Sequence, residues 1–137
     1  MPIVRDVMQR DVLTIPAAMP FAEILRVMVV AAVHGAPVID ENGKVVGMLS
    51  AMDLLRATEQ AYDDERDEGE GADPLAQLRQ ATARQLASPE PAWVRPDASL
   101  ADVARLMKDT GSHRILVGAD GRLDGIVTAF DLAVSSH

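Results

Sequence analysis

Apolar and polar positions along this chain follow two alternating periods, and the same order of periods occurs twice. In the first half, a short β-rich stretch at Asp11–Ile15 precedes an apolar helical face that begins after Pro20. Two short apolar runs, Ala36–Ile39 and Val45–Leu49, then flank a polar Glu-Asn-Gly turn, which is typical of a β-hairpin. A second helix is expected to begin near Met52. The pattern predicts a β-α-β-β-α unit.

The second half repeats this unit in sequence as well as in pattern. When Gly43–Leu54 (GKVVGMLSAMDL) is laid over Gly121–Leu132 (GRLDGIVTAFDL), five of the twelve positions agree. Upstream, Thr14–Met28 aligns with Trp93–Met107 when the offset between the copies is one residue larger than for the first alignment. The turn between the two apolar runs is one residue different in length in the two copies, which accounts for this change. Each copy is too small to bury a sufficient core alone, so the two are expected to pack together.

An acidic stretch without apolar period, Ala61–Asp73, separates the copies. It lacks the residue spacing of a calcium loop, so a solvated linker is favoured over a cation site. Asp73 and Pro74 fit the N-cap and first turn of a helix that is predicted to run to about Leu86. The predicted organisation is a first repeat over residues 1–60, a linker over 61–73, and a second repeat with its leading helix over 74–137.

Composition narrows the classes of function. The chain has 137 residues, 48% of them hydrophobic, and a formal charge of -8, which argues against nucleic-acid binding. It contains no cysteine, which excludes disulfides and thiol catalysis and favours a reducing cytoplasm. No apolar run approaches the roughly 20 residues of a membrane span. No phosphate-binding glycine loop or metal-ligand spacing is present, so an enzyme is not expected.

Duplicated β-α-β-β-α units that end in G-h-h-[ST]-x-x-D, where h is apolar, resemble the cystathionine beta-synthase (CBS) domain. The opening VRDVM and the fragment HGAPVIDENGKVVG extend the resemblance over nearly the whole chain outside the acidic linker. The resemblance implies an α+β fold in which two pseudo-symmetric CBS repeats pack as one Bateman module. Several such modules bind AMP, ADP, ATP or S-adenosylmethionine in clefts between the repeats and regulate an attached or partner protein.

The family's ligand-binding positions can be transferred to this chain. The resemblance places the ribose-binding carboxylate at Asp53 and Asp131, and the hydroxyl near ribose and phosphate at Ser50 and Thr128. A carboxylate can accept both donors of a ribose diol, and Arg114 is the strongest candidate for binding phosphate. The residues that enter the middle strand, and those that follow the opening motif of each copy, complete the expected ligand-binding set: His34, Gly35, Ala36, His113, Arg114, Ile115, Gln9 and Ser88.

The same residues permit a second interpretation. Ser50 and Asp53 also form a helix-capping pattern. In this pattern the hydroxyl accepts the backbone N–H of the acidic residue, and the carboxylate accepts the backbone N–H of the hydroxyl residue. Thr128 and Asp131 fit that pattern equally well. Gln9 stands where nucleotide-binding relatives often have Thr, so the two clefts are expected to be unequal.

The helical pattern that begins after Pro20 is apolar almost all round, unlike its counterpart in the second copy. Such a helix is expected to be covered on all sides, either inside the module or at a subunit interface. Because the family commonly pairs modules through these helices, a homodimer with Val29, Val30 and Val33 near the contact is expected. The leading hypothesis is a stand-alone regulatory module that senses an adenosine-containing ligand, requires no cofactor and acts on an unidentified protein. The alternative is a structural or adaptor homodimer that has lost ligand binding.

Overall fold

The computed structural model describes residues 2–65, 73–89 and 92–135, and it divides the chain into two compact units of mixed α and β structure. The first unit is Thr14–Pro89, and the second unit combines Met1–Leu13 with Glu90–His137. The leading 13 residues therefore pack with the second sequence repeat, although the sequence alone assigns them to the first.

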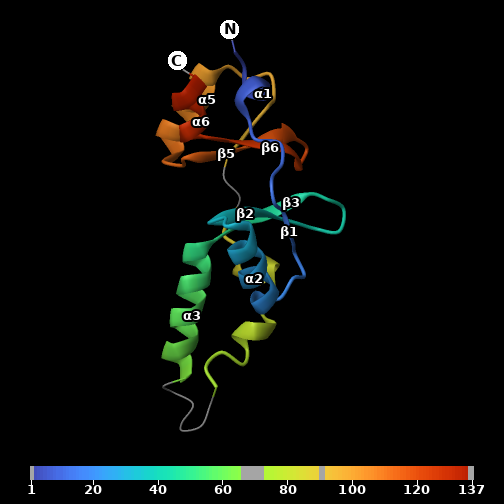
Figure 1. The fold of residues 1–137 in the computed structure, drawn as a ribbon, viewed down its shortest axis with the longest axis vertical. Coiled ribbons are helices and arrows are strands. Elements are labelled where there is room, and N and C mark those ends of the chain that lie inside the picture. The colour runs from blue at the N-terminus through green and yellow to red at the C-terminus, as the bar shows by residue number, and fades with distance from the viewer. Residues whose placement is uncertain (1, 66–72, 90–91, 136–137) are drawn as a thin grey trace. The chain divides into compact units, whose positions relative to one another are not determined.

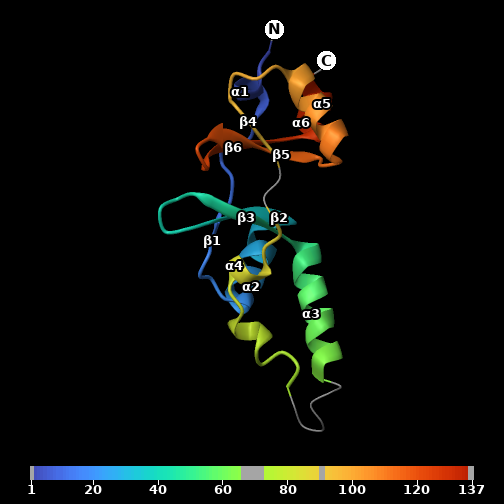
Figure 2. The ribbon, with the colours of Figure 1, turned by 180° about the vertical axis from the view of Figure 1, so that it is seen from behind.

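In the first unit, a three-stranded sheet has the order β1-β2-β3, with β1 parallel and β3 antiparallel to the central β2. Figures 1 and 2 show α2 and α3 on one face of this sheet. Ile24, Val38 and Leu49, from α2, β2 and β3, are fully buried. The elements are β1 (Ile15–Pro16), α2 (Phe21–Ala31), β2 (Gly35–Ile39), β3 (Val45–Ser50), α3 (Ala51–Glu65), η1 (Leu78–Gln80) and α4 (Ala83–Leu86).

The second unit repeats this topology with the sheet order β4-β5-β6. In Figure 1, α1, α5 and α6 lie on one face of the sheet. The core is a cluster of six buried residues, Val4, Val103, Met107, Ile115, Val117 and Val127. Val4 lies in the leading segment, which explains why that segment belongs to this unit. The elements are α1 (Val4–Val7), β4 (Trp93–Val94), α5 (Leu100–Thr110), β5 (Arg114–Ala119), β6 (Arg122–Thr128) and α6 (Ala129–Ser135).

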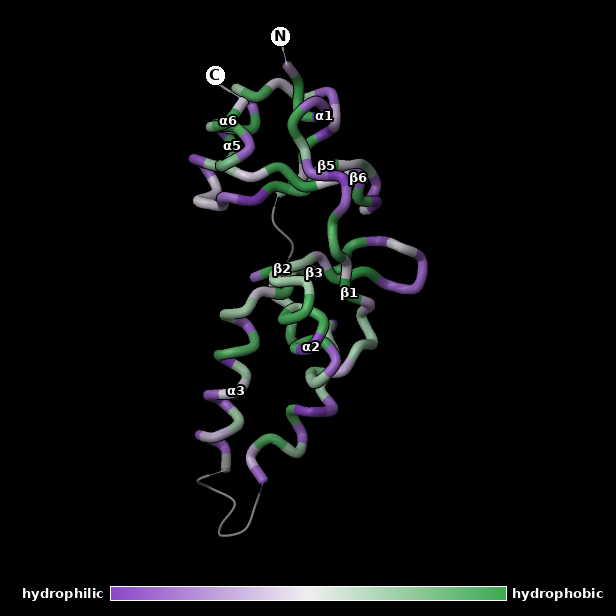
Figure 3. Tube along the Cα trace, in the orientation of Figure 1, coloured by the Kyte–Doolittle hydropathy of each residue, from purple (hydrophilic) through white to green (hydrophobic). Residues whose placement is uncertain are grey.

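The hairpin predicted in the first copy is confirmed, and its turn is held by a carboxylate. Asp40 Oδ1 accepts the backbone N–H groups of Lys44 and Asn42 at 3.0 and 2.9 Å. These bonds, that of Lys44 foremost, lower the pKa of Asp40 because they stabilise its charged form. Gly43 supplies the positive φ of 80° that the turn requires. Figure 3 shows this polar turn between two apolar strands.

The prediction of one continuous helix from Asp73 to about Leu86 is wrong. The chain instead forms η1 and α4, separated by Ala81 and Thr82 in extended conformations. The carbonyl of Ala81 accepts the N–H of Phe21 at 2.9 Å, so this stretch is bonded to the start of α2. Thr82 then begins a new helix through a capping box with Gln85. Tertiary hydrogen bonds and a local cap thus outweigh helix propensity here.

Two element boundaries also differ from the expected ones. The first strand is only Ile15–Pro16, whereas the sequence pattern indicates Asp11–Ile15. The helix α3 continues to Glu65 and so occupies the first five residues of the expected linker, 61–65. The remainder of that linker, 66–72, lies outside the described residues.

Candidate functional site

At the end of β3, the first unit places a hydroxyl and a carboxylate at the start of α3. The Ser50 N–H donates to Asp53 Oδ2 at 2.8 Å, and the Asp53 N–H donates to Ser50 Oγ at 3.1 Å. The capping interpretation is therefore confirmed for this pair. The cap occupies Asp53 Oδ2. The other carboxylate oxygen, Oδ1, takes no part in the cap and can accept hydrogen bonds from other groups.

The second unit builds the same arrangement where β6 meets α6. The Thr128 N–H donates to Asp131 Oδ2 at 2.9 Å, and the Asp131 N–H donates to Thr128 Oγ1 at 3.2 Å. Capping is confirmed here too. Since each pair is fixed by two reciprocal bonds, the carboxylates are held in place without a ligand.

The second oxygen of Asp53 is bound by a residue from the segment after α4. Ser88 Oγ donates to Asp53 Oδ1 at 2.8 Å. Arg56 Nη1 lies 3.4 Å from the same oxygen, and the Asp53 side chain is only 8% exposed. Two donors of this unit thus meet one carboxylate oxygen.

The corresponding oxygen of Asp131 is bound by a residue 122 positions away. Gln9 Nε2 donates to Asp131 Oδ1 at 3.3 Å. Gln9 and Ser88 follow the opening motifs of the first and second sequence copies, yet they reach the carboxylates of the second and first copies respectively. The fold therefore exchanges the two leading segments between the repeats, which a comparison of the sequence copies does not reveal.

The glycine of the G-h-h-[ST]-x-x-D motif makes this exchange possible. A Cβ added at Gly47 would lie 2.8 Å from the carbonyl oxygen of Ser88, and one at Gly125 would lie 2.6 Å from that of Gln9. The segment's backbone pairs with the strand at these points, in isolated bridges of Met48 with Ser88 and of Gln9 with Ile126. The glycine thus permits a close backbone approach that carries Ser88 or Gln9 to the aspartate. The motif glycine is the sequence signal for this role.

In the first unit, the residues that enter the middle strand lie beside the strand-end pair. The His34 carbonyl accepts the N–H of Ala51 at 2.8 Å, and Gly35 is the register partner of Ser50. The side chain of His34 is exposed. Ala36 is only 1% exposed, so neither its side chain nor its backbone is open to solvent.

In the second unit, the equivalent residues take equivalent places. The His113 carbonyl accepts the N–H of Ala129 at 3.0 Å, and Arg114 is the register partner of Thr128. His113 is exposed and Arg114 is half-buried. Ile115 belongs to the buried core, so its side chain is committed to packing.

The two strand-end arrangements contain the same kinds of polar group. Each set contains a hydroxyl whose oxygen accepts the helix N–H, a carboxylate that accepts hydrogen bonds, and an exposed histidine after the helix. Across residues 2–65, 73–89 and 92–135, no group of three or more His, Cys, Asp or Glu side chains is arranged to hold a metal ion.

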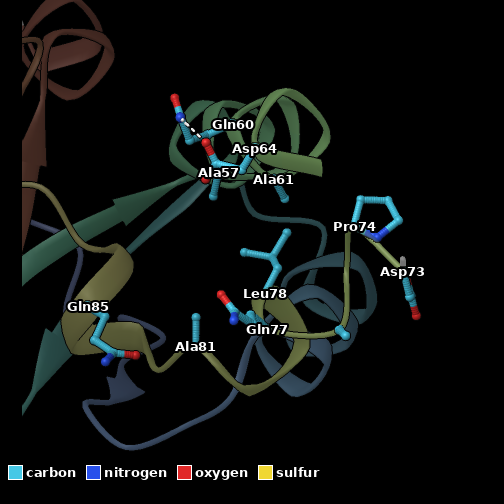
Figure 4. A pocket seen from close by; sticks show the side chains of 11 residues that line it. Ala57, Gln60, Ala61, Asp64, Asp73, Pro74, Gln77, Leu78, Ala81 and Gln85 are labelled. Carbon is cyan, nitrogen blue, oxygen red and sulfur yellow. Dashed lines mark hydrogen bonds between the residues drawn. The ribbon is translucent and has the colours of Figure 1, made fainter. Parts of the chain in front are cut away.

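A hollow of about 580 Å³ lies elsewhere in the first unit, between α3 and the chain from Asp73 to Gln85. Figure 4 shows Ala57 and Gln60 on one wall and Leu78 on the other. None of its lining residues belongs to the expected ligand-binding set. The candidate site therefore remains the two strand-end sets. The set of the first unit is Ser50, Asp53, Ser88, His34 and Gly35, and the set of the second unit is Thr128, Asp131, Gln9, His113 and Arg114.

The residues expected at a dimer contact lie on α2 and just after it. Val29 and Val30 are 70% and 80% exposed, and Val33 is half-buried.

In the part of the chain with described coordinates, no helix is long and apolar enough to cross a membrane.

Comparison with known families decides the identity of these repeats. The family model of the CBS domain matches residues 4–59 and again 83–136. The chain belongs to the CBS-domain family. Its two matches cover both strand-end sets, and the fold is that of a Bateman module formed by two CBS repeats.

Individual relatives of the chain agree with this assignment. The chloroplastic CBS domain-containing protein CBSX2 of Arabidopsis thaliana is 32% identical over 120 residues, which cover 77% of this chain and 50% of CBSX2. An uncharacterized protein of Methanocaldococcus jannaschii is 28% identical over 93% of this chain and 40% of its own length. The chain thus spans half or less of the length of these two relatives.

A solved structure of the family extends the likeness to three dimensions. The crystal structure of CBSX2 in complex with AMP has a TM-score of 0.76 and 29% sequence identity to this chain. The match covers 99% of this chain and 96% of that one.

Proposed function

We propose that this CBS pair is a regulatory module that binds an adenosine-containing ligand, namely AMP, ADP, ATP or S-adenosylmethionine. The observation that carries the proposal is the duplicated strand-end set, in which Asp53 or Asp131 presents a fixed carboxylate beside a hydroxyl. The crystal structure of the relative CBSX2 in complex with AMP supports it. Ligand occupancy would then be passed to a protein partner.

The chemistry of the set suits a nucleoside. A fixed carboxylate can accept hydrogen bonds from the two hydroxyls of a ribose. The exposed imidazoles of His34 and His113 are the proposed contacts to base and phosphate, whereas Ala36 and Ile115 are 1% and 0% exposed and leave a ligand little to contact. The guanidinium of Arg114 adds a bidentate phosphate donor.

The test is a thermal-unfolding panel of the purified chain with AMP, ADP, ATP, S-adenosylmethionine and NAD, each at millimolar concentration, with and without Mg²⁺. A ligand at 100 times its Kd stabilises the folded state by about 2.7 kcal/mol, so a true ligand gives a clear rise in melting temperature. A selective rise would identify the ligand class. No rise with any adenosine compound would contradict the proposal.

A second candidate function, an adaptor homodimer, is favoured by the exposed apolar surface of the first unit. Besides Val29 and Val30, the side chains of Leu25, Met52 and Leu55 are 45%, 53% and 61% exposed. Exposed apolar side chains in this number favour an interaction surface. We propose that a second copy of the chain covers it, with Val33 at its margin, and that the dimer serves either function.

A further inference from the structure

The two strand-end sets differ in how far the chain's own donors already satisfy the carboxylate. Asp53 Oδ2 accepts the N–H of Ser50 at 2.8 Å, and its Oδ1 accepts the hydroxyl of Ser88 at 2.8 Å. Arg56 adds a third donor at 3.4 Å. With both oxygens bonded and a side-chain exposure of 8%, this carboxylate has little capacity left for a ligand.

The carboxylate of Asp131 is less committed. Its Oδ2 accepts the N–H of Thr128 at 2.9 Å, but its Oδ1 receives only the exposed amide of Gln9, at 3.3 Å. The position equivalent to Arg56 is Val134, which carries no charge. A long bond from an exposed neutral side chain is exchanged easily for a better donor. The Oδ1 atom is therefore available to a ribose hydroxyl once Gln9 moves aside.

Positive charge is distributed with the same asymmetry. In the second unit, Arg114 is the register partner of Thr128 and, among the described residues, forms no ion pair with an acidic side chain. In the first unit, Gly35 stands in its place, and the arginine near the set, Arg56, lies against Asp53. The second unit thus combines an available carboxylate with an available guanidinium.

We infer that the second unit is the principal nucleotide-binding unit, with Asp131 as acceptor of the ribose hydroxyls and Arg114 as donor to the phosphate. Each chain then binds one nucleotide tightly. The first unit keeps its carboxylate occupied by Ser88 and Arg56. This inference rests on the proposed function and assigns that function to one of two similar sets.

The test is isothermal titration of the full chain with AMP, comparing wild type with Asp131→Asn and Asp53→Asn. The two variants are matched, because each changes the same position of a capping box and keeps a side chain of the same size. Wild type is expected to bind one AMP per chain. Asp131→Asn should weaken binding at least about tenfold, because a bond to a charged acceptor is lost, whereas Asp53→Asn should weaken it less than about threefold.

A second pair of variants tests the phosphate contact independently of the helix caps. Arg114→Ala should weaken AMP binding by about tenfold or more and leave the affinity for adenosine, which has no phosphate, within about twofold of wild type. Arg79→Ala is the control, since Arg79 is bonded to Asp73 at 2.7 Å and lies outside both sets. It should change neither affinity.

Four results would overturn the inference. A larger loss for Asp53→Asn than for Asp131→Asn, or two AMP sites of equal affinity, would contradict it and leave the proposed function intact. An Arg114→Ala variant that loses AMP and adenosine equally would remove the phosphate contact. A wild-type chain that gives no heat with AMP, ATP or S-adenosylmethionine would overturn the proposed function and the inference together.

Discussion

The hydroxyl of Ser88 donates to Asp53 Oδ1 at 2.8 Å across 35 positions of sequence. This bond joins the segment after α4 to the start of α3, and the bond from Gln9 to Asp131 joins the leading segment to the start of α6. Each proposed ligand carboxylate is therefore also the anchor of a segment that leads from one unit into the other. A ligand bound as proposed would compete with the anchored segment for the same oxygen atom, and the proposed function would thereby gain a route from occupancy to output.

The two anchors are expected to differ in strength. Ser88→Ala should lower the free energy of unfolding by about 1–2 kcal/mol, because it removes a short bond to a charged, largely buried acceptor. Gln9→Ala should cost less than about 0.5 kcal/mol, because its bond is long and exposed. Urea unfolding of both variants, with the slope held common, measures the difference. Equal losses would show that the 2.8 and 3.3 Å bonds are equivalent in solution.

The motif glycines predict a larger effect. Gly125→Ala should destabilise the chain by about 1–3 kcal/mol, because the new methyl group would lie 2.6 Å from the Gln9 carbonyl oxygen, and backbone cannot move aside cheaply. The measurement is amide hydrogen exchange, which should accelerate at Gln9 and Ile126, whose backbone groups form the bridge.

Gly43→Ala is the control for this substitution. Gly43 has a φ of 80° but open space around its added Cβ, so alanine there strains only the hairpin turn. It should destabilise the chain without a specific change at the Gln9 amide. Fast exchange at that amide in Gly43→Ala as well would indicate general loosening instead of a lost bridge.

The repeats, the hairpins and the two capping pairs could be predicted because their signals are local. Ser50 and Asp53 are three residues apart, and the strand and helix periods on either side fix where they lie. The resemblance to the CBS family points to the same local pairs. At these positions the structure forms the capping bonds that the sequence pattern predicts.

The partners of the aspartates could not be predicted in this way. Gln9 reaches Asp131 only because Val4, five residues earlier, is buried in the core of the second unit. A sequence repeat assigns each segment to the copy it precedes and cannot register an exchange between copies. The break at Ala81 has the same origin, since its carbonyl is bonded to Phe21 of a distant helix.

The cap of α4 is expected to define where that helix begins. Thr82→Ala should cost about 1 kcal/mol, because the hydroxyl that accepts the Gln85 N–H is lost. Thr82→Ser keeps the hydroxyl and should restore most of that stability. Thermal unfolding of the three proteins measures the effect. Failure of serine to rescue would assign the role of Thr82 to packing of its methyl group.

The exposed face of α2 gives the last prediction. Val30 is 80% exposed, so Val30→Asp should change the stability of the isolated chain by less than about 0.5 kcal/mol. If a second copy covers this face, the substitution buries an unpaired charge in the contact and should convert dimers to monomers. Sedimentation velocity across a range of concentrations distinguishes the two states.

Lys108→Asp on the exposed side of α5 is the matched control, because it introduces the same side chain on the twin helix at a position that, among the described residues, forms no ion pair. It should leave the dimer intact. A Val30→Asp protein that sediments as wild type would show that α2 takes no part in self-association. The exposed apolar side chains of Val29, Met52 and Leu55 would then be assigned to contact with a different protein, as the adaptor function requires.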